Sequence, residues 1–208
     1  MNKLLIIFII LLSSCAVDFK TIPQVVNAII YKTDIPISRD FYLQQDYSFA
    51  KVNIGRNRVL IFVLESIHKN GDYQWISSNN DLMITRNGKI INFLNDEGMG
   101  FSYQALSANF DFNELTRISY NFLTSGSNIL LSQDAIFSIY DKPDYIGIFD
   151  DESLVTKTTV IEESVKTLRY TWKFQNKYWL NSAGEVLQSE QFVHPNIPKL
   201  EIKYFYRY

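Results

Sequence analysis

Short runs of strand-forming residues, separated by tight-turn dipeptides, fill the chain from Phe49 to its end. The run Val59–Ile67 (VLIFVLESI) is continuously apolar, which predicts a strand covered on both faces. Asn70-Gly71, Asn87-Gly88 and Ala183-Gly184 predict hairpin turns, because such residues accept positive φ angles. Strand and helix patterns do not alternate. The sequence therefore predicts an all-β fold, an antiparallel sandwich or open β-barrel of about a dozen strands.

The remaining elements follow from the same patterns. Leu168–Gln175 alternates apolar and polar residues, which predicts a half-buried strand. Asn95–Asn109, which contains Gly98 and Gly100, predicts a long loop. Ile22–Lys32 has apolar residues at helical spacing and predicts a short N-terminal helix. Further strands are predicted at Tyr73–Ser77, Leu82–Arg86, Lys89–Phe93, Arg117–Leu123, Ala135–Tyr140, Tyr145–Phe149, Leu154–Glu162, Tyr178–Leu180, Val186–Gln191 and Leu200–Tyr206.

The first residues have the layout of a bacterial lipoprotein signal. Lys3 precedes the apolar run Leu4–Leu12, which is shorter than the roughly 20 residues of a spanning helix. Leu12-Ser13-Ser14-Cys15 resembles a lipobox, in which the cysteine becomes the lipidated first residue of the mature chain. We therefore expect a signal peptide over residues 1–14, a lipidated tether over 15–21 and a single all-β periplasmic domain over 22–208. An ordinary signal peptide and an uncleaved anchor are the alternatives.

Lipidation of Cys15 also agrees with the cysteine count. Cys15 is the only cysteine, so an exported chain whose Cys15 sulfur carries lipid keeps no free thiol. Two or three acyl chains, palmitate among them, anchor a protein stably to a membrane. The residue after the cysteine is Ala16 rather than the aspartate that favours inner-membrane retention. The expected location is the periplasmic face of the outer membrane.

The sequence offers little for catalysis or for metal and cofactor binding. Its net charge is −2 without a basic run, which excludes a nucleic-acid footprint. His68 and His194 lack metal-ligand spacing, and no phosphate-binding glycine loop occurs. A Ser-His-Asp triad stays open from sequence order alone. We therefore predict a protein that is not an enzyme and that holds no metal or cofactor.

Acidic residues occur in two short groups. Asp150-Asp151-Glu152 lies between two predicted strands, where acidic turn residues are ordinary. Glu162 and Glu163 are adjacent on a strand, so their side chains point to opposite faces. A glycosidase needs two carboxylates that face each other across a cleft. These groups therefore favour solvated residues over a catalytic pair.

Aromatic residues are the remaining candidates for ligand contacts. Trp75, Trp172 and Trp179 have ring faces that could stack on sugars, although aromatic residues are also enriched inside sheets. Tyr204, Tyr206 and Tyr208 share one face of the last predicted strand, and such a cluster forms a partner site if it is exposed. The residues proposed to contact a glycan or a partner are Trp75, Arg86, Trp179, Tyr204 and Tyr206.

Several motifs together resemble the YjbF/GfcB family of lipoproteins, which is encoded in group 4 capsule and related exopolysaccharide operons. The matching residues are Tyr47-Ser48-Phe49-Ala50, Trp75-Ile76-Ser77, Thr85-Arg86-Asn87-Gly88-Lys89-Ile90, Tyr178-Trp179-Leu180, Gly184, Ser189-Glu190-Gln191, Pro195 and Pro198. Residues Phe101 to Glu163 carry little of the family pattern, and the tail after Pro198 is unusually rich in tyrosine.

The resemblance implies an outer-membrane lipoprotein that assists assembly or export of a surface polysaccharide and has no active site. Its partners would be the membrane, through lipid on Cys15, and a polysaccharide or an export-machinery protein. Two alternatives remain open: a hydrolase or lyase that modifies the polysaccharide, and a carrier of lipid inside a β scaffold.

Overall fold

The computed structural model describes residues 36–56, 58–95, 100–105, 117–124, 130–140, 142–151, 154–169 and 171–207. The predictions made for the signal peptide, Cys15, the tether and the helix at 22–32 lie outside these residues. Among the described residues, no helix is long and apolar enough to cross a membrane. The described part has one short α-helix, α3 (Arg39–Leu43), whose N-cap Ser38 accepts the backbone N–H of Phe41.

Thirteen strands follow α3 within the described residues. They are β1 (Phe49–Ile54), β2 (Arg58–Ile67), β3 (Asp72–Ser77), β4 (Leu82–Arg86), β5 (Lys89–Leu94), β6 (Gly100–Ala105), β7 (Arg117–Thr124), β8 (Leu130–Ile139), β9 (Asp144–Gly147), β10 (Val155–Thr167), β11 (Lys173–Leu180), β12 (Val186–Gln191) and β13 (Leu200–Phe205). The all-β prediction is therefore confirmed.

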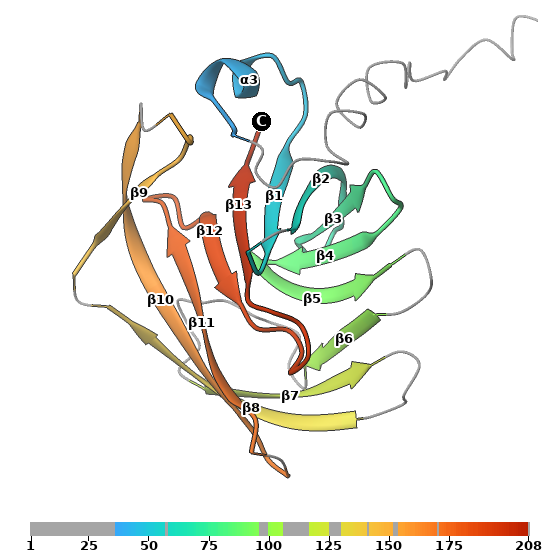
Figure 1. Ribbon diagram of the computed structural model, residues 1–208. Helices are drawn as coiled ribbons and strands as arrows, with labels where there is room; N and C mark the ends of the chain where they lie inside the picture. Colours follow the sequence, from blue (N-terminus) through green and yellow to red (C-terminus); the bar gives the residue numbers. More distant parts are fainter. Residues whose placement is uncertain are drawn as a thin grey trace, which may run out of the picture. The chain divides into compact units, whose positions relative to one another are not determined.

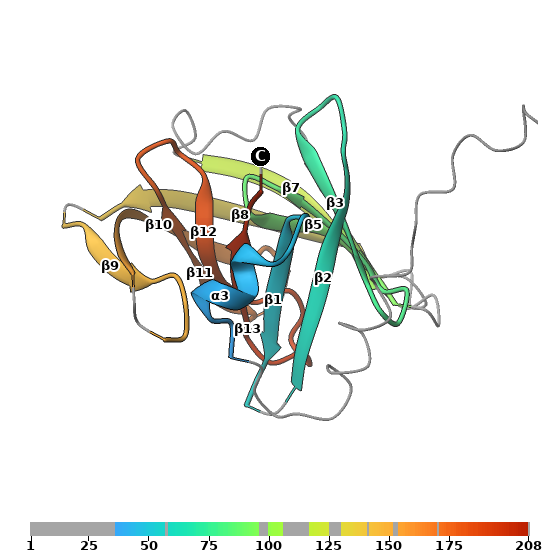
Figure 2. The same ribbon diagram turned by 90° about the horizontal axis from the view of Figure 1, so that it is seen from above.

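Twelve of the described strands close into one antiparallel barrel (Figures 1 and 2). The order runs from β1 to β8 along the chain, then through β10, β11, β12 and β13 back to β1. β9 is the extra strand, paired with the first residues of β10 outside the ring. The closed ring has no free strand edge. The sequence predicted an open barrel or a sandwich, and closure is the feature that it did not predict.

The ring closes where the two ends of the described chain meet. Phe49–Ile54 of β1 pairs along its whole length with Leu200–Phe205 of β13. On the outer side of this seam the rings of Phe49 and Phe205 stack 4.7 Å apart. The ring of Tyr42 in α3 and the ring of Phe149 pack against Phe205. The helix and the segment after β9 therefore cover the outside of the seam.

A cluster of charged residues holds the segment after β9 against the barrel. The Asp150 carboxylate lies 2.9 Å from Lys51 Nζ and 3.1 Å from Lys203 Nζ. It also accepts the backbone N–H of Ile37 at 2.8 Å. Lys51 and Lys203 are cross-strand partners, and like charges in that position repel each other. Asp150 therefore neutralises a pair of lysines that would otherwise destabilise the seam.

The predicted hairpins form, with two kinds of turn. Asn87 and Gly88 have φ angles of 47° and 72°, as a type I′ turn requires. At Gly71 and Gly184 only the glycine has positive φ, and the preceding residues make a longer turn closed by hydrogen bonds from His68 to Asp72 and from Asn181 to Glu185. β2 is buried on both faces only near its centre, and Ile67 is 51% exposed.

Two predictions were wrong. Leu168–Gln175 is not one strand: β10 continues to Thr167, the chain turns after it, and β11 begins at Lys173. The turn carries no glycine, proline or asparagine among its described residues, so no residue type there predicts the end of a strand. Asn95–Asn109 is not one loop either, because Gly100–Ala105 forms β6 between β5 and β7. Gly98 and Gly100, at the start of this stretch, concealed the strand.

Candidate functional site

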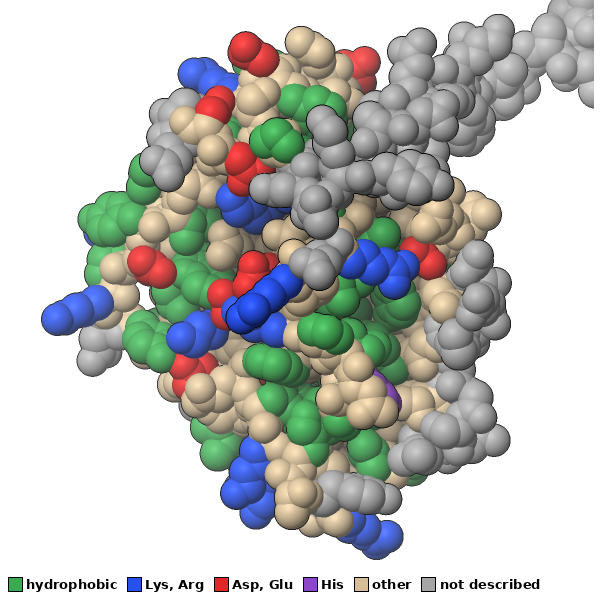
Figure 3. Space-filling view, viewed as in Figure 1, with side chains coloured by type: hydrophobic (Ala, Val, Ile, Leu, Met, Phe, Trp, Pro, Cys, Tyr) green, Lys and Arg blue, Asp and Glu red, His purple; other side chains and the backbone are tan. Residues whose placement is uncertain are grey.

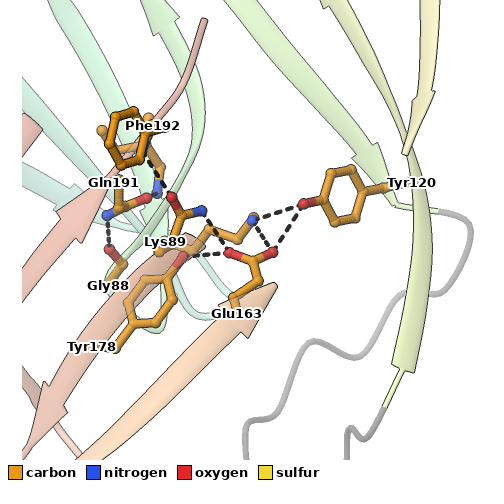
Figure 4. Close-up of polar contacts among 9 residues, drawn as sticks. Gly88, Lys89, Tyr120, Glu163, Tyr178, Gln191 and Phe192 are labelled. Carbon is orange, nitrogen blue, oxygen red and sulfur yellow. Dashed lines mark hydrogen bonds and ion pairs between the residues drawn. The ribbon is translucent and has the colours of Figure 1, made fainter. Parts of the chain in front are cut away.

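A charged cluster lies at the centre of the barrel (Figure 4). Lys89 of β5 and Glu163 of β10 form an ion pair, and their side chains are 4% and 0% exposed. The Glu163 carboxylate accepts further hydrogen bonds from the hydroxyls of Tyr120 and Tyr178 at 2.9 and 2.8 Å. The side-chain amide of Asn176 donates a fourth, at 2.8 Å. Each carboxylate oxygen therefore has two donors.

Strand alternation places these groups in the interior. In β10 the odd-numbered Ile161, Glu163 and Val165 are buried, so a carboxylate projects between two apolar side chains. Lys89 follows the type I′ turn at Asn87-Gly88 and points across the ring. Charges removed from water are costly unless they are paired and hydrogen-bonded, and this cluster meets both conditions.

Burial and pairing set the protonation of the cluster. Burial raises the pKa of Glu163, but the charge of Lys89 and the hydrogen bonds from Lys89, Asn176 and Tyr178 outweigh it, so the pKa lies below its ordinary value. Burial lowers the pKa of Lys89, and Glu163 offsets this only in part. Burial and the Glu163 charge raise the pKa values of Tyr120 and Tyr178 well above the ordinary value. The tyrosines are therefore neutral donors to a carboxylate.

A second polar network joins β5 to β12 and β13. Gln191 Nε2 donates to the Gly88 carbonyl at 2.7 Å, and Gln191 Oε1 accepts the backbone N–H of Ile90 at 2.9 Å. The Tyr204 hydroxyl donates to the same Gly88 carbonyl at 2.9 Å. These bonds cross the barrel interior, so the turn at Gly88 is fixed against the opposite wall.

The connection between β12 and β13, Phe192–Lys199, folds against the inner aromatic residues. The His194 ring lies 6.3 Å from the Phe122 ring, and the Phe192 ring lies 6.2 Å from Phe174. Residues of this connection line two hollows, which we call the outer groove and the inner pocket. They share His194, Asn196, Ile197 and Pro198, so the connection forms a common wall.

The inner pocket has a volume of about 780 Å³ and an apolar lining. Its walls include Phe62, Met83, Ile90 and Phe101, all members of the barrel core. Arg58, Asn79 and Asn95, which flank strand ends, add polar groups. A largely apolar cavity of roughly 300–1,000 Å³ with a few polar groups is the usual form of a small-molecule site.

The outer groove has a volume of about 1330 Å³ and a different character. Its lining combines Trp172, Phe192 and other apolar groups with five cationic and two acidic side chains. The cationic side chains are Arg117, Lys166, Lys173, Lys177 and Lys199; the acidic ones are Asp134 and Glu190. In Figure 3 basic and hydrophobic side chains lie together on the face of the molecule that is viewed.

Of the residues proposed for glycan or partner contact, the structure brings Trp75, Tyr204 and Tyr206 together and places the other two elsewhere. Trp75 and Tyr204 lie in the barrel interior at 0% and 2% exposure, and Tyr206 stacks on Tyr204 with ring centroids 5.9 Å apart. Trp179 is 7% exposed beneath β9, and its Nε1–H donates to Asp144 at 2.8 Å. Arg86 forms an ion pair with Asp72 near the β2–β3 turn. Trp75 and Tyr204 fill the barrel core, and Trp179 is covered by Ile146 of β9, so none of these three rings is exposed. Trp172, by contrast, lines the outer groove.

Four of the five acidic residues considered for catalysis also lie apart, and the fifth, Glu152, lies outside the described residues. Asp150 binds two lysines, and Asp151 accepts the backbone N–H of Arg39 at 3.3 Å. Glu162 and Glu163 point to opposite faces as predicted, Glu162 outward toward Tyr140 and Gln175. Neither hollow is lined by any of the four. Over the described ranges, no group of three His, Cys, Asp or Glu side chains is placed to hold a metal ion.

The interior cluster was not identified from the sequence, although a signal for it exists. Glu163 lies two residues from Ile161 and from Val165 on one face of an otherwise apolar strand pattern. A charge on the apolar face of a strand indicates a buried partner. Lys89 carries no such signal. It is the first residue of β5, directly after a turn, where a lysine is ordinarily exposed, and only the folded barrel shows that its side chain points inward.

Residues 148–205, which span β10 to β13, match the family model described as "Group 4 capsule polysaccharide lipoprotein gfcB, YjbF". This match includes the C-terminal motifs of the resemblance and not the hairpin of Trp75 to Ile90. No curated protein matches the chain in sequence.

Solved structures extend the comparison. The hypothetical lipoprotein YmcC from Escherichia coli K12 superposes with a TM-score of 0.72 at 17% identity, over 94% of this chain and 98% of that one. A protein with a YmcC-like fold from Bacteroides fragilis, thought to be exported, gives 0.41 at 8% identity, over 78% and 95% of the two chains. The barrel is therefore the YmcC fold. Together, the sequence match over β10 to β13 and the shared fold confirm the predicted resemblance to the YjbF family of group 4 capsule polysaccharide lipoproteins.

Proposed function

We propose that this protein is an outer-membrane lipoprotein, anchored through Cys15, that assists assembly or export of a capsule or exopolysaccharide without catalysing a reaction. The observation that carries the proposal is the family match over residues 148–205. The matched strands supply Glu163, Tyr178 and Gln191 to the barrel interior. These residues stabilise a closed ring, as a scaffold for binding requires.

The arrangement of ionisable groups supports a role without catalysis. The Lys89–Glu163 pair is enclosed by donors and has no contact with either hollow. A general acid or base must reach the proton that it transfers, within hydrogen-bond distance or through one water molecule. The ion pairs of Asp150 and Arg86 lie at strand ends and on the outer wall, where they hold segments together.

Deletion of the gene in its own host tests the proposal. We expect surface polysaccharide to fall while cytoplasmic sugar precursors stay normal. A plasmid copy of the natural sequence should restore the polysaccharide, and Cys15→Ala should not, because the unlipidated chain is no longer held at the membrane. A deletion strain with unchanged surface polysaccharide would contradict the proposal. If the Cys15→Ala variant restored the polysaccharide as well as the natural sequence does, the proposed anchoring through Cys15 would be contradicted.

The inner pocket favours a second candidate function, carriage of an apolar molecule. Its volume and its lining of Phe62, Met83, Ile90 and Phe101 suit a hydrocarbon chain. Fatty acids of increasing length should bind the purified protein, with affinity rising about fourfold per methylene group until the pocket is full. Affinity that is independent of chain length, or absent, would remove this candidate.

A further inference from the structure

The lining of the outer groove has more cationic than acidic side chains. Asp134 is the cross-strand partner of Lys166 on β8, but its two carboxylate oxygens are bonded to Arg117 at 2.9 Å and to the Ser119 hydroxyl at 2.6 Å. Glu190 lies 3.0 Å from Lys199. Lys177 lies in register between Glu162 and Glu190. Lys166 and Lys173 are exposed, and neither forms an ion pair within the described part of the chain. The groove is therefore cationic in a protein whose net charge is −2.

Lys166 and Lys173 are direct cross-strand partners, on β10 and β11. Like charges in this position destabilise a sheet unless an anion lies between them. The seam of the same barrel has an equivalent pair, Lys51 and Lys203, and there the carboxylate of Asp150 contacts both ammonium groups. By this comparison, the pair in the groove is suited to hold a carboxylate or phosphate from outside the chain.

Shape and aromatic groups narrow the class of ligand. The lining crosses five neighbouring strands, β7, β8, β10, β11 and β12, a width of roughly 19 Å at the usual strand spacing. This width suits an extended polymer rather than a small ion. Trp172 is half-buried and packs on Phe174 at 4.4 Å, which holds its indole ring in place in the groove wall. A fixed indole ring offers an apolar surface for a sugar ring.

We propose that the outer groove binds a strand of acidic polysaccharide. A carboxylate or phosphate of the glycan lies between Lys166 and Lys173, and a sugar ring contacts Trp172. The choice of a glycan over another polyanion rests on the proposed function, whereas the anion site rests on the lysine pair alone. The apolar inner pocket, on the other side of the β12–β13 connection, takes no part in this contact.

Binding of model polysaccharides to the purified full-length chain in detergent tests the inference. Alginate, a carboxylated glycan, should bind, and neutral dextran should not. Added salt should weaken alginate binding, because exposed charges are screened. The double variant Lys166→Glu/Lys173→Glu should bind alginate about tenfold more weakly or worse. Trp172→Leu should weaken alginate binding while leaving binding of inorganic polyphosphate unchanged.

A matched variant separates the groove from a general charge effect. Lys69→Glu/Lys157→Glu changes the net charge equally at two exposed positions outside the groove. It should keep the natural affinity, and circular dichroism should show that both double variants are folded. Equal weakening in the two double variants, equal binding of alginate and dextran, or no alginate binding overturns the proposal. If any of these accompanies normal rescue of surface polysaccharide by the natural protein, the groove inference fails and the proposed function stands.

Discussion

At the scale of single residues, Glu163 places a charged group in the interior of the barrel. Its carboxylate is fully buried, carries a charge and accepts bonds from Lys89, Tyr120, Asn176 and Tyr178. A buried pair of this kind adds little net stability over an apolar pair, but loss of one partner leaves the other charge uncompensated. The cluster therefore favours one arrangement of the interior side chains rather than adding to the free energy of unfolding.

Replacement of Glu163 should consequently be severe. Glu163→Gln leaves the Lys89 ammonium buried without a counter-charge and should lower the free energy of unfolding by about 3–5 kcal/mol. Glu162→Gln is the matched control: the neighbouring side chain points outward, and its loss should change stability by about 1 kcal/mol or less. Urea unfolding measures both variants. Equal effects in the two would show that the interior charge pair has no special role.

His194 predicts a pH dependence of stability. Burial lowers the pKa of His194 below its ordinary value, and its Nδ1 accepts the backbone N–H of Asn196 at 3.1 Å, which the protonated ring cannot do. The unfolded chain therefore binds the proton more readily than the folded chain. Stability is fully present above about pH 6.5 and is lost as the pH falls from there through the folded pKa.

The size of this effect corresponds to one hydrogen bond, about 0.5–1.5 kcal/mol. Urea midpoints measured from pH 7.5 to pH 5 should decline for the natural chain, and His194→Asn should remove most of that slope. A slope retained by the variant would assign the pH dependence to other groups, such as the carboxylates that titrate at lower pH.

At the scale of elements, tight turns decide which strands meet. The turn at Asn87-Gly88 joins β4 to β5 and directs Lys89 into the barrel, where Gly88 receives bonds from Gln191 and Tyr204. Gly88 also has no room for a side chain, because an added Cβ would lie 2.6 Å from Val186. The glycine is therefore required both by its positive φ and by the wall opposite.

Gly88→Ala should destabilise the protein more than Gly184→Ala. Both glycines have positive φ, which costs an alanine about 1–2 kcal/mol, but nothing lies within 4 Å of a Cβ at Gly184. Overpacking against Val186 adds about 1–3 kcal/mol at Gly88. Thermal unfolding compares the two variants directly. Equal losses would mean that Val186 moves aside without cost.

These elements also show what could be predicted from sequence. Asn-Gly turns and alternating strands are local signals, so β4 and β12 have the predicted bounds, Leu82–Arg86 and Val186–Gln191. The turn after Thr167 has no such signal, and the strand β6 begins with a glycine, a residue that ordinarily predicts a turn. The partnership of Lys89 with Glu163 joins strands 74 residues apart, which no local pattern encodes. The outer groove could not be predicted from the sequence for the same reason, because its lining comes from strands that only the closed barrel places side by side.

At the scale of the whole molecule, one pairing closes the fold. Neighbours in the ring are otherwise consecutive in sequence or separated only by β9, whereas β1 and β13 join the two ends of the described chain. The backbone carbonyls of Leu43 and Gln45 accept bonds from the Arg207 guanidinium beside this seam. Closing so long a loop carries a large entropic cost, and the seam is where that cost is offset.

A circular permutant of residues 36–207 tests this view of the seam. A short flexible linker from Arg207 to Pro36, with new ends in the Asn181–Gly184 turn, makes the β13–β1 pairing local and moves the long-range closure to β11 and β12. Because the contacts are unchanged and the new ends lie in an exposed turn, we expect the same circular dichroism and a cooperative urea transition.

A chain that stops at Pro198 loses β13, and with it the bonds of Ile202 to β1 and β12 and the interior side chain of Tyr204. It should lack a cooperative transition. If the truncated chain folds cooperatively or the permutant does not, closure through β13 is not what completes the barrel.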